Sequence, residues 1–324
     1  MDEPCDQINK YYRHMKQTFY SNGKLLITGE YLVLDGAQAL ALPTRFGQSL
    51  EVTPINEPKI NWKSYDIKGK VWLDTTINLN EITSFQKKGT HKSAIEIAKL
   101  ISILKEAQKL NPNFLRNNSG FAVNTYLDFP RNWGLGSSST LINNIASWAN
   151  VDAFTLLKKT FGGSGYDIAA AQNNHPIIYQ KTKNNQEVKA LHLNWNFTHQ
   201  LFFVHLNKKQ NSSEAIKQYE LQKEKTNTFQ SKINDLTSQF TNCKTLEKFE
   251  YLIVEHEALI SKAIKQKPIK ERLFSDFKGS IKSLGAWGGD FILATGNREN
   301  QDYFRNKGYQ TILTFQEMIL SNQN

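Results

Sequence analysis

Residues 130–139 read Pro130-Arg131-Asn132-Trp133-Gly134-Leu135-Gly136-Ser137-Ser138-Ser139. They lie between an alternating segment, residues 121–129, which predicts a strand, and a segment from about Thr140 to Ala149, which predicts a helix. Glycines let a backbone turn sharply and approach a ligand closely. Free N–H groups at a helix start bind anions, and serine hydroxyls can contact phosphate or magnesium. The pattern predicts a phosphate-binding loop; the alternative is an ordinary tight turn capped by serine.

Two further glycine-rich segments carry candidate site residues. In Gly162-Gly163-Ser164-Gly165-Tyr166-Asp167-Ile168, a carboxylate stands between small residues and an apolar run. This placement suits a base or a metal ligand, and the alternative is a helix N-cap. The second segment is Gly285-Ala286-Trp287-Gly288-Gly289-Asp290, expected between a helix over Lys270 to Ser283 and a strand over Phe291 to Ala294. It is a turn that could close a phosphate site.

Composition and charge limit the class of protein. The chain has 324 residues, which suggests about two domains, and 39% of them are hydrophobic, which excludes a wholly disordered chain. No run approaches ~18 consecutive apolar residues, so we expect no membrane-spanning helix. The net charge of +10 favours anionic partners, although the lysines could simply solvate the surface. The basic residues form no long block, which argues against a nucleic-acid-binding tail.

The chain is expected to divide into a polar leader over residues 1–18, a first domain over 19–190 and a second over 191–324. The first is β-rich, with a helix from about Ser93 to Lys109. In the second, Leu201 to Leu206 predicts a strand, and residues 212–265 predict two long helices broken near Asn242-Cys243. Two cysteines provide no disulfide framework, and no secretory signal is visible, so we expect a cytoplasmic protein.

Several common catalytic motifs are absent. Neither Gly23-Lys24 nor Gly69-Lys70 is followed by Ser or Thr, so the chain has no Walker A motif. The Gly-x-Ser-x-Gly pattern of a nucleophile elbow does not occur. His256-Glu257 lacks the second histidine of a zinc-binding helix, because position 260 is Ile260.

The three glycine-rich segments, together with Gly29-Glu30-Tyr31-Leu32-Val33-Leu34, resemble the GHMP kinase family of galactokinase, homoserine kinase, mevalonate kinase and phosphomevalonate kinase. Gly165-Tyr166-Asp167-Ile168-Ala169 resembles the GYDIA-type branch of bacteria. The resemblance extends from about Phe19 to Ala294. It implies a two-domain α+β fold, with a ribosomal-protein-like α/β N-terminal domain that binds ATP and a ferredoxin-like α+β C-terminal domain.

The resemblance also implies roles for individual residues. Asp167 stands where the family has its catalytic aspartate, and Lys24 is expected beside it, keeping that carboxylate ionised and stabilising the transferred phosphoryl group. Ser138 and Asp167 are the expected magnesium ligands. The residues expected to hold the nucleotide are Gly134, Leu135, Gly136, Ser137, Ser138, Ser139, Gly288 and Gly289. Those expected to hold the substrate are Glu30, Arg131, Lys208, Lys209 and Ser212.

The last three of these rest on the residues themselves. Lys208-Lys209-Gln210-Asn211-Ser212-Ser213 follows the predicted strand and precedes a predicted helix, so its cations and hydroxyls could bind an anion. The alternative is a solvated turn with Ser212 or Ser213 as N-cap. Two features depart from the family pattern. Trp287 replaces a small residue, and between 140 and 166 the only acidic residue is Asp152, which leaves a second metal ligand unassigned.

The expected function is an ATP- and Mg²⁺-dependent small-molecule kinase. Its best acceptor is an anionic one, phosphomevalonate, because the chain is basic and the Glu30 and Asp167 segments look most like phosphomevalonate kinase. The alternatives are a mevalonate kinase, a diphosphomevalonate decarboxylase and a non-catalytic ligand-binding homologue. We expect a small-molecule partner, no nucleic acid and no membrane, and a monomer or homodimer.

Overall fold

The computed structural model describes residues 15–84, 92–116, 119–183, 185–208, 216–217, 219–221, 229–285, 287 and 289–320. The chain forms two compact units, each built from separate stretches. Unit 1 contains Met1–Ser21, Gly47–Pro130 and Ser137–Gly163; unit 2 contains Asn22–Phe46, Arg131–Gly136 and Ser164–Asn324. Strands β1 (Gln17–Leu26) and β2 (Ala39–Ile55) pass from one unit to the other.

Unit 1 contains the β4-β3-β5-β2 part of a seven-stranded sheet, which continues from β2 into β6 (Ile177–Lys181) and β7 (Gln186–Ala190), with β1 also paired to β2. Its further strands are β3 (Lys59–Tyr65), β4 (Val71–Asn78) and β5 (Gly120–Leu127). β3 runs parallel to β5, whereas β2 is antiparallel to it. Alternate residues of β3 are buried, as expected for a strand with one face on a core. The strands expected near residues 60–62, 71–73 and 121–129 are therefore confirmed.

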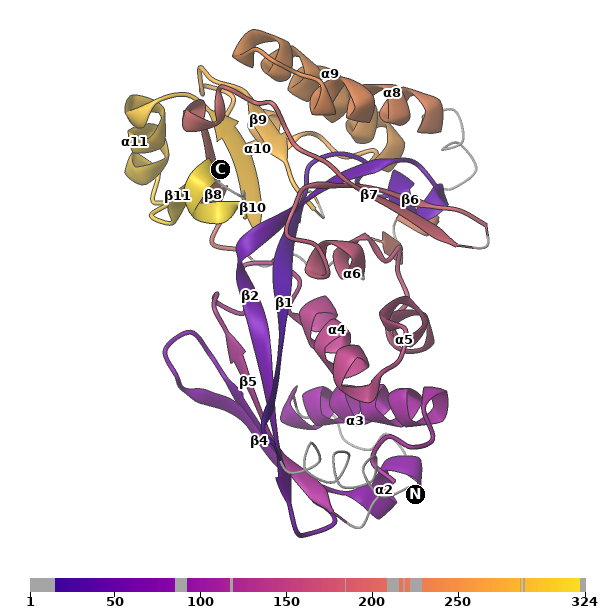
Figure 1. Cartoon of the computed structure of the whole chain (residues 1–324). Coiled ribbons are helices and arrows are strands. Elements are labelled where there is room, and N and C mark those ends of the chain that lie inside the picture. Colours follow the sequence, from indigo (N-terminus) through magenta and orange to yellow (C-terminus); the bar gives the residue numbers. More distant parts are fainter. Residues whose placement is uncertain are drawn as a thin grey trace. The chain divides into compact units, whose positions relative to one another are not determined.

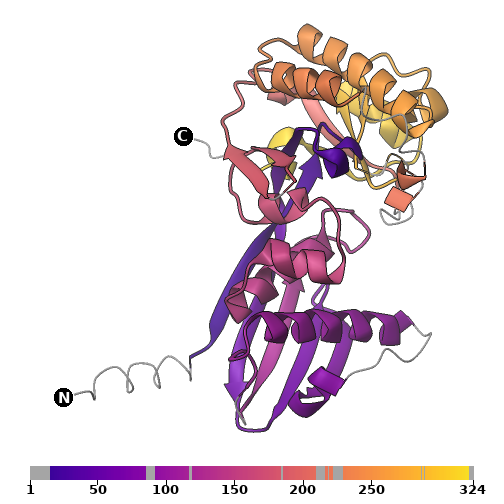
Figure 2. The same ribbon diagram turned by 90° about the vertical axis from the view of Figure 1, so that its right-hand side faces the viewer.

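Helices cover one face of this sheet. They are α2 (Leu79–Ser84), α3 (Lys92–Leu110), α4 (Ser137–Ala149) and α5 (Ala153–Thr160). α3 contacts both α4 and α5, and Figures 1 and 2 show α3 running along the sheet. Leu100 and Leu104 of α3 and Ile142 and Ile145 of α4 are buried on the inner sides of these helices. The helices predicted from about Ser93 to Lys109 and from about Thr140 to Ala149 are confirmed.

Unit 2 contains an antiparallel sheet of order β11-β8-β10-β9, formed by β8 (Leu201–His205), β9 (Ile281–Ser283), β10 (Phe291–Thr295) and β11 (Ile312–Thr314). Its helices are α6 (Tyr166–Ala171), α8 (Gln230–Thr241), α9 (Leu246–Ile264), α10 (Ile269–Leu273), α11 (Arg298–Asn306) and α12 (Phe315–Met318). Two short 3-10 helices, η1 (Leu32–Asp35) and η2 (Thr198–Gln200), and the hairpin of β6 (Ile177–Lys181) and β7 (Gln186–Ala190) complete it. α8 and α9 pack together, as Figure 1 shows.

The expected break between two helices near Asn242-Cys243 is confirmed. α8 ends at Thr241, and α9 starts after Thr245, whose side chain accepts a hydrogen bond from the Lys248 N–H at 3.3 Å. The mixed helices and the two sheets also confirm the expected α+β fold class. Among the residues that the structure describes, no helix has both the length and the apolar character needed to cross a bilayer.

The helix expected over Lys270 to Ser283 is wrong. α10 ends at Leu273, and the chain then turns into β9, whose Ile281 pairs with Ala294 of β10. Phe274, Phe277 and Ile281 are spaced like one face of a helix, but they reach a common hydrophobic core from a turn and from a strand. The Gly285–Asp290 turn therefore joins two strands rather than a helix and a strand.

Candidate active site

The glycine-rich loop adopts a backbone that glycine permits. Gly134 and Gly136 have φ values of 68° and 92°, in the left-handed region that side chains disfavour. Leu135 between them is fully buried and anchors the loop. α4 begins directly after the loop, so Ser137 is the first of its 13 residues. The first N–H groups of a helix have no partners within that helix, which makes this junction suitable for an anion.

Lys24 of β1 holds the loop, and both belong to unit 2. Its backbone N–H donates to the Leu135 carbonyl at 3.0 Å, and its ammonium donates to the Gly134 carbonyl at 3.0 Å. A Cβ atom added at Gly136 would lie 3.3 Å from Lys24 Cε. The sequence predicted that Lys24 lies beside Asp167. In the structure, the Lys24 ammonium contacts the backbone of the glycine-rich loop as well.

A tyrosine and two carboxylates act on the pKa of the Lys24 ammonium. Burial by itself would lower the pKa of Lys24, because a buried ammonium loses its hydration. Tyr166, whose ring centroid lies 5.7 Å from Nζ, and the carboxylates of Asp167 and Asp290 act in the opposite direction. The net effect is a raised pKa of Lys24. The side chain is therefore a fixed cation at neutral pH.

Asp167 lies in the first turn of α6. The N-cap of this helix is Gly165, in the left-handed region at φ 93°, and no side chain caps it. Asp167 is half-buried, and its Oδ1 accepts the Ile168 N–H at 3.2 Å. The left-handed glycine turns the chain so that Tyr166 and Asp167 both act on Lys24. Asp167 is thus not the N-cap of α6.

Asp290 is a second carboxylate at the loop, and no role was expected for it. A Cβ atom added at Gly134 would clash with the Asp290 carboxylate, so this carboxylate packs against the loop backbone. The backbone of Asp290 is fixed by two hydrogen bonds, from its N–H to the Lys208 carbonyl at 2.6 Å and from the Leu206 N–H to its own carbonyl at 2.7 Å. The sequence signal that could have identified Asp290 was an acidic residue that follows two glycines and directly precedes a buried strand.

Trp287 of the same turn belongs to the hydrophobic core. Its indole is fully buried in a hydrophobic cluster with Tyr31, Leu32 and Tyr219, among others. This burial explains how a bulky side chain is accommodated where the family resemblance suggested a small one. Gly289 is buried and precedes Asp290, whereas Gly288 lies outside the described residues.

Glu30 is fully buried in a group of polar side chains, which we call the Lys282 cluster: Glu30, His256, Glu257, Lys282 and Ser283. Lys282 Nζ donates to Glu30 Oε1 at 2.6 Å and to Glu257 Oε1 at 3.1 Å. The Ser283 hydroxyl donates to Glu257 Oε2 at 2.5 Å. The carboxylate of Glu30 is thus enclosed by the Lys282 cluster. Its expected contact with substrate remains a prediction.

The other oxygen of Glu30 lies 3.3 Å from His256 Nε2, but this contact is not an ion pair. Burial lowers the pKa of His256 well below its ordinary value, so the imidazole is neutral. Its Nε2 already accepts the Gly29 N–H at 3.3 Å. Burial raises the pKa of Glu30 to about 7, although the positive charge of Lys282 works against this. The negative charge of Glu257 adds a smaller effect in the same direction as burial.

This shifted pKa predicts a pH dependence of stability. A carboxyl group whose pKa rises from 4.5 in the unfolded chain to about 7 in the folded one favours folding while protonated. Its contribution is complete below pH 4.5 and is lost as the pH rises to about 7. The full loss is about 3 kcal/mol. Glu30→Gln should remove this component, so urea unfolding at pH 5 and pH 8 should show a smaller decline for the variant. Parallel pH profiles of the two proteins would contradict the assignment.

The remaining substrate candidates are only partly placed. Arg131 is half-buried at the start of the loop. Lys208 is exposed, and its carbonyl bonds Asp290, so its backbone lies at the same turn. Lys209 and Ser212 lie outside the described residues. Their binding of an anionic substrate stays a prediction.

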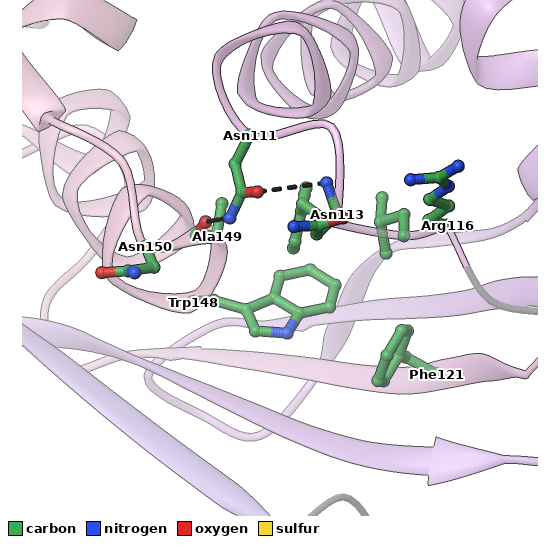
Figure 3. A pocket seen from close by; sticks show the side chains of 9 residues that line it. Asn111, Asn113, Arg116, Phe121, Trp148, Ala149 and Asn150 are labelled. Carbon is green, nitrogen blue, oxygen red and sulfur yellow. Dashed lines mark hydrogen bonds between the residues drawn. The ribbon is translucent and has the colours of Figure 1, made fainter.

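The described residues form no preformed metal cage, and a pocket in unit 1 is lined by residues other than the candidate site residues. Within the described ranges, no group of three or more His, Cys, Asp or Glu side chains could hold a metal. A pocket of about 220 Å³ lies in unit 1, under the end of α4 (Figure 3). Trp148 packs edge-on against Phe114 and Phe121 there, and the Asn111 amide is used locally, donating to the Ala149 carbonyl at 2.7 Å. None of the candidate site residues lines this pocket.

Comparisons with known proteins identify the fold. No protein-family model and no curated protein matches the sequence. Solved structures match over nearly the whole chain. Mevalonate kinase of Methanococcus jannaschii has a TM-score of 0.69 at 17% identity, covering 96% of this chain and 100% of its own. Phosphomevalonate kinase of Streptococcus pneumoniae, solved with phosphomevalonate and AMPPNP, has a TM-score of 0.66 at 16% identity, covering 92% and 100%.

A sugar kinase is equally similar. Galactokinase of Lactococcus lactis, solved with galactose, has a TM-score of 0.68 at 14% identity, covering 95% of this chain and 96% of its own. The three proteins act on different acceptors, so the likeness does not select among them. It agrees with the two sheets described above. The chain has the GHMP kinase fold.

Proposed function

We propose that this protein is an ATP-dependent small-molecule kinase, which transfers the γ-phosphoryl group of ATP to an anionic acceptor with the help of Mg²⁺. The observation that carries the proposal is the contact of the Lys24 ammonium with the Gly134 carbonyl, beside the charges of Asp167 and Asp290. A cation fixed on a phosphate loop and a neighbouring carboxylate are the parts that phosphoryl transfer needs.

The described residues fit a nucleotide and a magnesium ion. Gly134 and Gly136 carry no Cβ atoms and adopt left-handed backbones, and the first N–H groups of α4 have no partners within that helix. Magnesium is commonly bound by one or two carboxylates together with substrate phosphates, which suits Asp167 and Asp290. When bound, the ion would neutralise charge on the transferred phosphoryl group.

The side chains then divide the work between them. The Lys24 ammonium would stabilise negative charge on the transferred group, and its contact with the Gly134 carbonyl keeps it in position. With an alcohol acceptor, Asp167 would accept the hydroxyl proton as the oxygen attacks phosphorus and ADP leaves. A phosphate acceptor is already ionised, so there Asp167 would orient the acceptor rather than remove a proton.

We infer that the acceptor is phosphomevalonate. The net charge of +10 favours an anion, and Arg131 and Lys208 are cations of the segments that flank Gly134 and Asp290. The phosphomevalonate kinase neighbour was solved with phosphomevalonate. Each charge-assisted contact would contribute ~1.5–3 kcal/mol to binding. A mevalonate kinase is the second candidate, because the mevalonate kinase of Methanococcus jannaschii matches over its full length.

The acceptor can be tested by steady-state kinetics. At fixed ATP and magnesium, ADP release with phosphomevalonate should give a higher kcat/KM than with mevalonate or galactose. The expected ratio is two to four powers of ten, the effect of losing two charge-assisted contacts, each ~1.5–3 kcal/mol. A higher kcat/KM for mevalonate would overturn the choice of acceptor and retain the kinase. Nucleotide binding without turnover of any acceptor would favour a non-catalytic homologue.

A further inference from the structure

The Lys282 cluster joins segments that are distant in sequence. Lys282 Nζ donates to Glu30, which follows β1, to Glu257 of α9 and to the Ser283 carbonyl of β9 at 2.7 Å. These three bonds use all three N–H donors of the ammonium. Lys282 is fully buried, so these bonds compensate for its lost hydration.

The turn that follows Lys282 is strained and enclosed. Besides Gly285, two residues with side chains, Trp287 and Asp290, have φ values of 55° and 54°. Such left-handed residues cost on the order of 1–2 kcal/mol each and persist only where their surroundings impose them. The Trp287 carbonyl accepts the Gln266 side-chain amide at 3.0 Å, and its ring centroid lies 5.9 Å from Lys282 Nζ.

The far end of this turn reaches the phosphate loop. Asp290 is the last residue before β10, and its carboxylate packs against the Gly134 backbone. The same carboxylate raises the pKa of Lys24. Between Lys282 and Asp290, the described contacts are those of Trp287, whose N–H donates to the Leu284 carbonyl and whose ring lies beside Lys282 Nζ. Lys282 also binds Glu30, which lies six residues beyond Lys24 on the same segment.

We propose that Lys282 is a positioning residue: by binding Glu30 and Glu257 it fixes the Gly285–Asp290 turn, and so holds the Asp290 carboxylate against the phosphate loop and beside Lys24. This inference rests on the proposed kinase function. Lys282 does not touch a reacting group, and its effect on catalysis is exerted through Asp290.

A purely structural role makes a different prediction. Replacing a whole buried ion cluster by neutral side chains of similar volume is often neutral or stabilising, whereas removing one member leaves a buried charge unpaired. The triple variant Glu30→Gln, Glu257→Gln and Lys282→Met removes every charge of the Lys282 cluster together. If the cluster only stabilised the fold, this variant would keep both its stability and its activity.

The first measurement needs no activity. Hydrogen exchange should be on the order of tenfold faster in the triple variant at two amides, the Trp287 N–H, which donates to the Leu284 carbonyl, and the Asp290 N–H, which donates to the Lys208 carbonyl. Exchange in α3 and α4 of unit 1 should not change. Unchanged protection of these two amides in the folded triple variant would overturn the proposal.

The second measurement is kinetic. In the triple variant kcat should fall on the order of 10²-fold, as a small displacement of a catalytic group can cost. In a variant that already carries Asp290→Asn, the same three changes should cost much less, because Lys282 acts through that carboxylate. Additive effects would contradict the proposal.

A third variant keeps the test decisive if the triple variant does not fold. Lys282→Arg retains the charge, but its planar fork cannot repeat the contacts of a compact ammonium. It should show the same faster exchange and the same non-additivity with Asp290→Asn, and normal exchange at the turn would overturn the inference. A wild-type protein that turns over no acceptor would refute the kinase function and leave the exchange result to stand alone.

Discussion

Asp167→Asn is expected to lower kcat by ~10²–10⁴-fold with an alcohol acceptor, the usual cost of losing a general base. The amide is nearly the same size as the carboxylate, and Asp167 is not the N-cap of α6, so the fold should persist. Nucleotide binding should be little changed, because Lys24 keeps its contact with the Gly134 carbonyl. Single-turnover kinetics and calorimetric titration of a nucleotide would measure the two effects separately.

Asp152→Asn provides a matched control. Asp152 caps α5 by accepting the Thr155 N–H at 2.7 Å, and asparagine caps a helix equally well. The same chemical change there should leave kcat unaltered. If Asp167→Asn lowered turnover less than about tenfold while the nucleotide still bound, the carboxylate would not be a general base. It would then orient the acceptor, which is the role we expect with a phosphate acceptor.

The sequence predicted the parts of the site that depend on local backbone geometry. Glycines spaced two residues apart between an alternating strand and a helix leave few conformations open, and Gly134 and Gly136 indeed have positive φ values. The same reasoning located α4 and the Gly165 turn before Asp167. In each case the information lies within about ten neighbouring residues.

Features that depend on distant partners could not be predicted in this way. Glu30 and Lys282 are 252 positions apart, and only the folded chain shows that they form a buried ion pair. Asp290 looked like an ordinary residue at the end of a turn until Gly134 was placed beside it. The segment from Lys270 to Ser283 misled because Phe274, Phe277 and Ile281 repeat with a helical period although one core buries all three.

Gly136→Val is expected to abolish nucleotide binding while the protein remains folded. The φ of 92° at this position disfavours any side chain, and a branched one most of all. A Cβ atom would lie 3.3 Å from Lys24 Cε, so the added methyl groups must displace either the loop or the ammonium that it carries. Either movement removes the close approach of backbone to phosphate, and the Kd for ATP should rise at least 10²-fold, about 2.7 kcal/mol.

Gly69→Val separates this effect from backbone strain. Gly69 has a comparable φ of 72°, but a Cβ atom there would meet no other atom within 4 Å. Its cost should therefore be the conformational one alone, on the order of 1–2 kcal/mol and a few degrees in Tm, with the Kd for ATP unchanged. A Gly136→Val protein that is folded and binds ATP as tightly as Gly69→Val would show that residues 134–136 are not the phosphate site. The proposed role of Lys24 would then fail with it, because its ammonium is fixed to that same loop.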